Sequence, residues 1–249
     1  MVQFADQSRY EYKYKISKDL IPQIRDYSAP YTTEDPYLKQ SSAAKYTVRS
    51  IYFDTPDLDF YYEKLDGLKI RKKLRVRTYN DMNDFAFLEI KRKFVNCVTK
   101  ERSKLPFMVI ERLINTPDES VMEYPEDDHN SRVVSGKFVY NLLRRGLLPV
   151  LLVVYEREAY IGLANERERL TLDTNVRALS EPDLGDILNT ENFVPTFQDA
   201  GILELKFDDN MPQWMKNLVR EFKLKKQSIS KYCLGIDACQ LSGNGEDSG

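Results

Sequence analysis

The chain has 249 residues, and 37 Lys and Arg residues against 39 Asp and Glu residues give it a formal net charge of -2. This length suits one large domain or two small ones and allows a substantial core. We expect a single domain over residues 1–241 and a disordered tail over residues 242–249, where Gly, Ser and acids predominate. The pI of about 5.7 argues against general binding to duplex nucleic acid, which a basic domain would favour.

The cysteines predict a reducing compartment, and the apolar segments predict neither a signal peptide nor a membrane span. The three cysteines show neither a disulfide framework nor the spacing of a zinc site. The N-terminal residues lack an apolar signal core, and the longest apolar run, Leu147 to Tyr155, is too short to span a bilayer. We therefore expect a cytoplasmic protein, and a peripheral position at a membrane through a partner protein stays open.

Charged and apolar residues alternate in the first predicted strand, residues 9–16, where the tyrosines and Ile16 share one face. The next predicted elements are a helix capped by Ser17 and running to about Tyr27, a loop over 30–42, a strand over 46–53 and a short helix or extended turn over 57–65. The N-terminal region is thus predicted to mix strands with short helices.

The segment from Lys69 to Lys104 carries twelve Lys and Arg residues against four acids, a net charge of +8 that leaves -10 for the rest of the chain. Many of the cations fall on alternate positions of two predicted strands, residues 69–79 and 85–94, with apolar residues such as Leu74 and Ile90 between them. A period of two places such cations on one face of a sheet. A cationic face in a chain of balanced charge indicates a site for a multiply anionic ligand.

Strands and helices also alternate beyond this segment. The predicted elements are a strand over 99–105, a short helix and an exposed acidic loop over 111–132, a helix over 135–147, strands over 150–162, 169–173 and 201–208, a helix over 212–225 and a second helical piece from Ser230. The sequence contains no internal repeats.

The two faces of these strands predict the architecture. About eight strands with short connections should be mainly antiparallel, and with the helices they make an α+β fold. Strand after strand pairs an apolar face with a charged one, so helices must cover the apolar side while the charged side cannot be a core. We expect an eight-stranded, mainly antiparallel β-barrel, or tunnel, with a polar cationic bore and a cover of helices.

A glutamate and a cation recur together on several predicted strands. The sets are Glu11 with Lys13, Glu89 with Lys91, Glu204 with Lys206, and Glu156 between Tyr155 and Arg157. Cross-strand ion pairing on a solvated face explains any single pair. A ligand site better explains the whole set, because the cations would neutralise a polyanion while one or two carboxylates held a divalent metal on its phosphates.

Other kinds of chemistry find little support in the sequence. The only histidine, His129, lies in an acidic loop, where we expect an exposed residue rather than a catalytic one. The chain has neither a P-loop nor a glycine-rich loop of the kinase type. Phosphoryl chemistry would therefore have to use charged side chains in place of a glycine cradle.

Seven short motifs occur in order along the chain. They are Arg9-Tyr-Glu-Tyr-Lys-Tyr14, Ser50-Ile-Tyr-Phe-Asp-Thr55, Arg71-Lys-Lys-Leu-Arg-Val-Arg-Thr-Tyr79, Phe87-Leu-Glu-Ile-Lys-Arg-Lys93, Tyr155-Glu-Arg157, Leu203-Glu-Leu-Lys-Phe207 and Ser230-Lys-Tyr232. This ordered set resembles the VTC-type polyphosphate polymerase domain of the triphosphate tunnel metalloenzyme (CYTH-like) superfamily, over roughly residues 8–240. The resemblance implies an eight-stranded antiparallel tunnel that holds a nucleoside triphosphate or polyphosphate together with a divalent metal, Mn2+ or Mg2+.

The resemblance also implies roles for individual residues. The residues implied to bind phosphate are Arg9, Lys13, Arg75, Arg77, Lys91, Lys104, Tyr155, Arg157, Lys206, Ser230 and Lys231, of which Arg75, Arg77, Lys91, Arg157 and Lys231 are implied to be catalytic. Glu204 matches the metal-binding glutamate of the family, and Lys104 shares its region with Lys100 and Arg102. Ser228 stands where the family often has a basic residue, and Lys225 or Lys226 could compensate.

The implied reaction is transfer of the γ-phosphoryl group of ATP to the end of an inorganic polyphosphate chain by a metal-dependent phosphotransferase. Such an acceptor is already an anion, so alignment and charge neutralisation can suffice without a strong base. Two rivals stay open: a tunnel triphosphatase that positions water with Glu11, Glu89 or Glu156, and a non-catalytic sensor that presents bound polyphosphate or nucleotide to a membrane partner. ATP and polyphosphate are the expected ligands, and nucleic acid is not.

Overall fold

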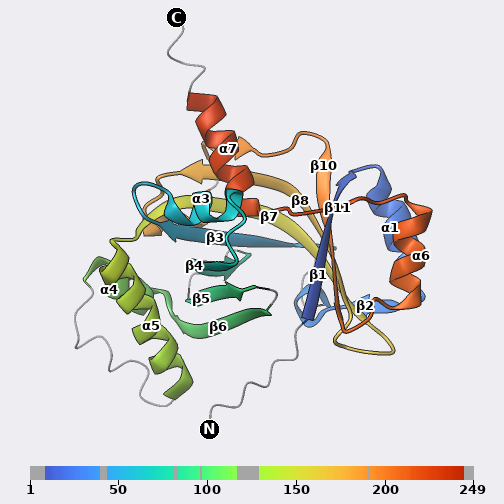
Figure 1. Cartoon of the computed structure of the whole chain (residues 1–249), viewed down its shortest axis with the longest axis horizontal. Helices are drawn as coiled ribbons and strands as arrows, with labels where there is room; N and C mark the ends of the chain where they lie inside the picture. The colour runs from blue at the N-terminus through green and yellow to red at the C-terminus, as the bar shows by residue number, and fades with distance from the viewer. Residues whose placement is uncertain are drawn as a thin grey trace, which may run out of the picture. The chain divides into compact units, whose positions relative to one another are not determined.

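The computed structural model describes residues 9–39, 44–80, 84–95, 97–116, 129–189 and 191–243, with backbone alone at residues 9, 97, 98 and 241–243 (Figure 1). The strands are β1 Arg9–Ser17, β2 Thr32–Glu34, β3 Tyr46–Asp54, β4 Ile70–Tyr79, β5 Phe85–Phe94, β6 Cys97–Pro106, β7 Leu148–Gly162, β8 Arg169–Ser180, β9 Val194–Pro195, β10 Ala200–Asp208 and β11 Lys226–Gln227. The helices are α1 Leu20–Ser28, α2 Pro36–Lys39, α3 Asp59–Leu65, α4 Phe107–Asn115, α5 His129–Arg145, the 3-10 helix η2 Leu184–Leu188, α6 Gln213–Glu221 and α7 Lys231–Gly243.

The strands form one hydrogen-bonded order, β11-β1-β10-β8-β7-β3-β4-β5-β6, with β2 paired to β7 and β9 paired to β8. Within the described residues this 11-stranded sheet begins at β11 and ends at β6, so it is not closed. The expectation of a closed eight-stranded barrel is therefore wrong in both respects. Eight longer strands are present as expected, but β2, β9 and β11 have only two or three residues each, too few to show a period of two.

Contacts within the chain divide it into two compact units. Unit 1 comprises residues 1–47, 155–177 and 195–231, and unit 2 comprises residues 48–154, 178–194 and 232–249. The long strands β7 and β8 supply residues to both units. In the described parts of the chain, no helix is long and apolar enough to cross a membrane. The expectation of a single domain stays a prediction.

In unit 1 the helices α1 and α6 lie side by side over one face of the strands β1, β10 and β8 (Figure 1). Their buried residues Ile24 and Met215 pack against strand residues such as Tyr14, Leu172 and Leu203. Strand residues alternate between faces, so the positions between these apolar residues lie on the opposite face. The predicted division into a helix-covered apolar face and a charged face is confirmed for this unit.

Unit 2 repeats the same division with β3 to β6, which pair antiparallel in sequence order. Helices α4 and α5 lie together against this part of the sheet (Figure 1). Leu74 and Ile90 are fully buried, and Phe138 and Leu142 of α5 pack in the same cluster. The cationic alternation predicted for residues 69–94 therefore does have an apolar reverse side that helices cover.

Several expected element boundaries need correction. Residues 30–42 were expected to be a loop, but they contain β2 and α2, because Thr32 to Glu34 pairs with β7 and Asp35 accepts the Leu38 N–H at 2.8 Å. Ser17 ends β1 instead of capping α1, which begins at Leu20. Tertiary pairing decides both cases, and short segments carry no sequence period that could reveal it.

The C-terminal half also departs from the expected boundaries. The helix predicted from Ser135 begins earlier, at the exposed His129, and β8 continues past Asp173 to Ser180. The acidic loop lies mostly outside the described residues. Of the tail predicted over residues 242–249, the first two residues belong to α7, and residues 244–249 lie outside the described set.

Candidate functional site

Two glutamates and two lysines interlock on the polar face of unit 1, and we call them the Lys-Glu cluster. In the antiparallel pairing of β1 with β10, Glu11 stands opposite Lys206 and Lys13 stands opposite Glu204. The Lys13 Nζ lies 2.8 Å from a Glu11 carboxylate oxygen and 3.5 Å from one of Glu204, while the Lys206 Nζ lies 2.7 Å from the other Glu204 oxygen. The predicted Glu-x-Lys pairs of two strands thus meet as one cluster.

Charge strongly favours the ionised form of Glu204. Its side chain is only 5% exposed, and this burial acts to raise its pKa. Nearby cations, foremost Lys206 and Lys13, outweigh burial and hold the pKa of Glu204 well below its usual range. A buried, ionised carboxylate is a hard oxygen ligand, of the kind that Mg2+ and Mn2+ accept.

A second carboxylate on the same face, Asp173 of β8, holds two of the predicted phosphate ligands. The Arg157 guanidinium donates from Nε and Nη2 to the two carboxylate oxygens at 2.6 and 2.8 Å, and the Lys231 Nζ lies 2.5 Å from Oδ2. Both cations also lie over the Tyr155 ring, at 5.2 and 4.6 Å from its centroid. Asp173 is fully buried, and Arg157 and Lys231 lower its pKa despite the opposing effect of burial.

Unit 2 carries the cationic face that the sequence predicted, and its centre is a single carboxylate. Glu89 of β5 is 1% exposed, and four cations from β4 and β6 approach it. Arg75 and Lys100 are the nearest, each at 2.6 Å, followed by Arg102 at 3.2 Å and Arg77 at 3.8 Å. We call these five residues the Glu89 cluster.

The pKa values of neighbouring groups report a positive potential around the Glu89 cluster. Burial acts to raise the pKa of Tyr52, but the charges of Arg75, Arg77 and Lys73 outweigh it and lower the pKa to about 7. The Arg75 guanidinium also donates to the Tyr52 hydroxyl at 3.0 Å. Burial and the charges of Arg75 and Arg77 lower the pKa of Lys100 to about 7 although Glu89 opposes them. One carboxylate therefore does not neutralise this face.

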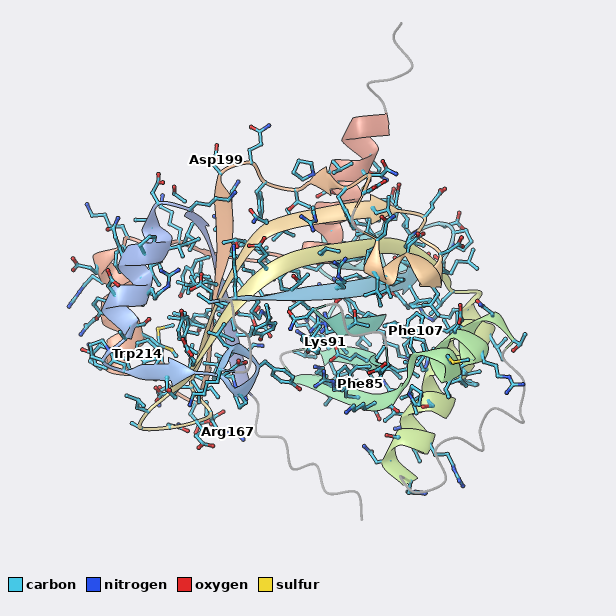
Figure 2. The ribbon with its side chains drawn as sticks, turned by 180° about the vertical axis from the view of Figure 1, so that it is seen from behind. Phe85, Lys91, Phe107, Arg167, Asp199 and Trp214 are labelled. Carbon is cyan, nitrogen blue, oxygen red and sulfur yellow. The ribbon has the colours of Figure 1, made fainter. Side chains whose placement is uncertain are left out.

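Two further predicted site residues of unit 2, Lys91 and Lys104, lie on strands of the Glu89 cluster without belonging to it. Lys91 lies two positions after Glu89 on β5, opposite Lys73 and Lys100 (Figure 2). Lys104 is exposed, and its Nζ lies 3.6 Å from the centroid of the Phe85 ring, so it is Lys100 and Arg102 of β6 that reach Glu89.

The other predicted residues lie at the ends of elements of unit 1, at the start of β1 and just before α7. Arg9 stands opposite Asp208 at the start of β1, and its side chain is outside the described set. Ser230 immediately precedes α7, next to Ile229, whose carbonyl accepts a hydrogen bond from Lys13 at 3.4 Å. Ser228 is exposed.

One member of the predicted Glu-cation set belongs elsewhere. Glu156 alternates with Tyr155 and Arg157 along β7, so it lies on the opposite face, where it forms an ion pair with Lys45. Asp173 was not among the predicted site residues, although its alternation with Leu170 and Leu172 already placed it on the polar face.

The fold and the two polar faces define an α+β protein that gathers cations around buried carboxylates, an arrangement suited to binding anions. Residues 8–240 match the VTC domain family, and the chain belongs to that family. A curated relative is vacuolar transporter chaperone complex subunit 4 of Schizosaccharomyces pombe, 28% identical over 226 residues that cover 76% of this chain and 31% of the relative. The chain therefore spans about a third of the length of the curated relative it matches.

Two solved structures resemble the fold at low sequence identity. A candidate adenylate cyclase from Bacillus halodurans has a TM-score of 0.46 and 12% identity, with 90% of this chain and 95% of that chain covered. A protein from Pyrococcus horikoshii OT3 has a TM-score of 0.45 and 15% identity, with 96% of this chain and 99% of that chain covered.

Proposed function

We propose that the protein is a polyphosphate polymerase that transfers the γ-phosphoryl group of ATP to the end of an inorganic polyphosphate chain. One observation carries the proposal: four cations surround the single buried carboxylate Glu89, and the positive potential there lowers the pKa of Tyr52 to about 7. A multiply charged phosphate ligand would neutralise that potential. Membership of the VTC domain family and the resemblance of the ordered motifs support this choice among polyanions.

The side chains on the two faces would bind and orient phosphoryl groups. Arg75, Arg77 and Arg157 have planar guanidinium groups that can contact two phosphoryl oxygens at once, whereas Lys13 and Lys231 supply point charges. An acceptor phosphate is already an anion, so these residues need only align it and neutralise charge.

A divalent cation, Mn2+ or Mg2+, is part of the proposal. The described residues contain no group of three or more His, Cys, Asp or Glu side chains suited to a metal ion. Mg2+ is commonly held by one or two carboxylates together with substrate phosphates, and Glu204 with neighbouring Glu11 fits that pattern. When bound, the cation would withdraw charge from the phosphoryl oxygens.

The surroundings of the protein are also proposals. The relative is named as a subunit of a vacuolar transporter chaperone complex, which supports a partner protein at a membrane. We propose a cytoplasmic position beside such a partner, with ATP and polyphosphate as ligands.

Incubation with ATP and Mn2+ or Mg2+, followed by sizing of the phosphate products, tests the reaction. Polyphosphate that lengthens with time, together with release of ADP, is the expected result. Free phosphate alone would make the protein a triphosphatase. Tight ligand binding without turnover under either metal would make it a sensor.

Two variants link the reaction to the clusters. Arg75→Ala and Glu204→Gln should each abolish metal-dependent synthesis, at least about 10²-fold. Arg75→Ala removes a cation that would bind phosphoryl oxygens, and Glu204→Gln removes the carboxylate that would hold the metal. Arg25→Ala is the matched control, since Arg25 forms a bidentate pair with Glu158 on the helix-covered side and should leave synthesis unchanged. Full synthesis by Arg75→Ala or Glu204→Gln, with the control also active, would refute the assignment.

A further inference from the structure

Thr171 of β8 has a buried hydroxyl that finds no hydrogen-bond partner among the described residues. The residue is 5% exposed, and its Oγ1 is among the buried polar atoms without a partner. A buried hydroxyl left unsatisfied is costly, and native proteins keep such groups for a reason. The described protein groups provide no such reason, so we consider the molecules that the polar face could bind.

The position of Thr171 places it among the proposed ligands of unit 1. Leu170 and Leu172 on either side are fully buried in the core, so Thr171 lies on the opposite, polar face. It stands directly opposite Glu204 in the pairing of β8 with β10, and Asp173 follows two positions later on the same face. The hydroxyl therefore lies between the Lys-Glu cluster and the Asp173 anchor.

The charged neighbours of Thr171 are paired with one another and make no hydrogen bond to its hydroxyl. The Glu204 carboxylate is engaged by Lys13 and Lys206, and the Asp173 carboxylate is engaged by Arg157 and Lys231. The cations themselves are donors only. A ligand rich in acceptor oxygens complements a donor held in this position.

We infer that the Thr171 hydroxyl donates a hydrogen bond to a phosphoryl oxygen of the ligand bound on the polar face of unit 1. The inference rests on the proposed function, and it adds one neutral hydrogen-bond donor to the cations proposed to bind phosphate. Thr171 is then a binding residue whose hydrogen bond forms only when phosphate is present. This contact distinguishes a ligand placed beside Glu204 from one held by long-range charge alone.

Removal of the hydroxyl should weaken ligand binding without weakening the fold. Thr171→Val keeps the shape of the side chain, so the thermal midpoint of the unliganded chain should be unchanged or higher. The dissociation constant for inorganic tripolyphosphate, measured by titration calorimetry, should rise roughly tenfold or more, as expected for a lost hydrogen bond to a charged group. Thr171→Ser keeps the hydroxyl and should bind within about threefold of wild type.

Thr78 provides a matched control in unit 2. Its Oγ1 is also buried and without a partner, but Thr78 shares the helix-covered face with Leu74 and Val76. Thr78→Val therefore removes an equally buried hydroxyl from a face that does not meet the proposed ligand. Its affinity for tripolyphosphate should equal that of wild type.

Three results would overturn the inference. Thr171→Val could bind tripolyphosphate as tightly as wild type, or it could lower the unliganded midpoint while Thr171→Ser restores it, which would show that water or protein already bonds the hydroxyl. If Thr171→Val does not fold, equal affinity of Thr171→Ala and Thr171→Ser has the same meaning. A wild-type chain that does not bind tripolyphosphate overturns the proposed function itself, and this inference with it.

Discussion

At the scale of single residues, the Glu89 cluster shows how neighbouring charges change ordinary side chains. Lys100 and Tyr52 each have a pKa of about 7, against ordinary values of 10.5 and 10.0. Desolvation disfavours the charged form of both groups. The surrounding guanidiniums further disfavour the Lys100 ammonium, whereas they favour the Tyr52 phenolate and outweigh its desolvation. Both groups therefore titrate near neutral pH.

These two groups predict a pH dependence of ligand binding. As pH rises from 6 to 8, Lys100 loses its positive charge and Tyr52 gains a negative one, so tripolyphosphate should bind more weakly relative to a variant that cannot titrate. The Lys100→Met, Tyr52→Phe double variant provides that reference and also removes the effect of the ligand's own titration. Calorimetry at several pH values measures the difference, and identical profiles for the two proteins would contradict the prediction.

The same shifts affect folding with a definite sign. Both folded pKa values lie below the ordinary ones, so the unfolded chain binds more protons between about pH 7 and 10. Tyr52 stabilises the fold fully above pH 10, and this stabilisation is lost as pH falls through about 7. The cost of charging Lys100 beside Arg75 and Arg77 appears over the same fall. Both groups thus make the fold more stable as pH rises through this window.

At the scale of elements, Asp54 joins the end of β3 to two helices of unit 2. Its fully buried carboxylate accepts the N–H groups of Phe60 and Tyr61 in the first turn of α3, at 2.9 and 3.1 Å, and the N–H of Thr55 at 2.8 Å. The Tyr232 hydroxyl of α7 donates to it at 2.5 Å. One side chain therefore satisfies otherwise unpaired donors of a short helix and anchors another.

This arrangement predicts large and unequal losses of stability. Asp54→Ala leaves several buried donors unpaired and should cost about 3 kcal/mol of unfolding free energy. Tyr232→Phe removes a single hydrogen bond and should cost about 1–2 kcal/mol. Asp57→Ala, at an exposed position nearby, is the control and should change little. Urea unfolding of the full chain measures all three, and equal stability of Asp54→Ala and the control would refute the capping role.

At the scale of the whole molecule, charge is segregated and not merely balanced. Residues 69–104 carry +8, and the rest of the chain carries -10. Within the positive segment, Arg75 and Arg77 are only 19% and 7% exposed, so these cations are sheltered rather than spread over an open surface. Compact phosphate ligands can reach such groups, but the rigid backbone of a duplex cannot contact many of them at once.

The molecule should therefore discriminate strongly between polyanions. In a competition experiment with labelled tripolyphosphate bound, unlabelled tripolyphosphate or polyphosphate should displace the label at low concentration. Duplex DNA at the same phosphate concentration should not, at about 0.15 M salt. Equal competition by DNA would show that binding depends on general charge, and it would contradict the sheltered site.

Particular residues show how far the sequence could be read. The alternation of Arg75 and Arg77 with Leu74 and Val76 predicted both the strand and its two faces, because side-chain direction in a strand depends only on local geometry. Glu156 shows the limit of such patterns, since its neighbours in sequence suggested the polar face while alternation placed it on the other. Lys104 shows another limit, because only the pairing register of β5 with β6 determines that Lys100 and Arg102 reach Glu89.

The sequence by itself determined the α+β class, the eight longer strands, their apolar and cationic faces and the family, because these depend on local period and on ordered motifs. Only the tertiary structure decided that the described sheet has 11 strands and is not closed, since pairing partners and short edge strands depend on contacts distant in sequence. It also decided that Asp173 holds Arg157 and Lys231, and that the Thr171 hydroxyl has no partner in the part of the chain that the structure describes. Those facts depend on which side chains meet, and no local pattern encodes that.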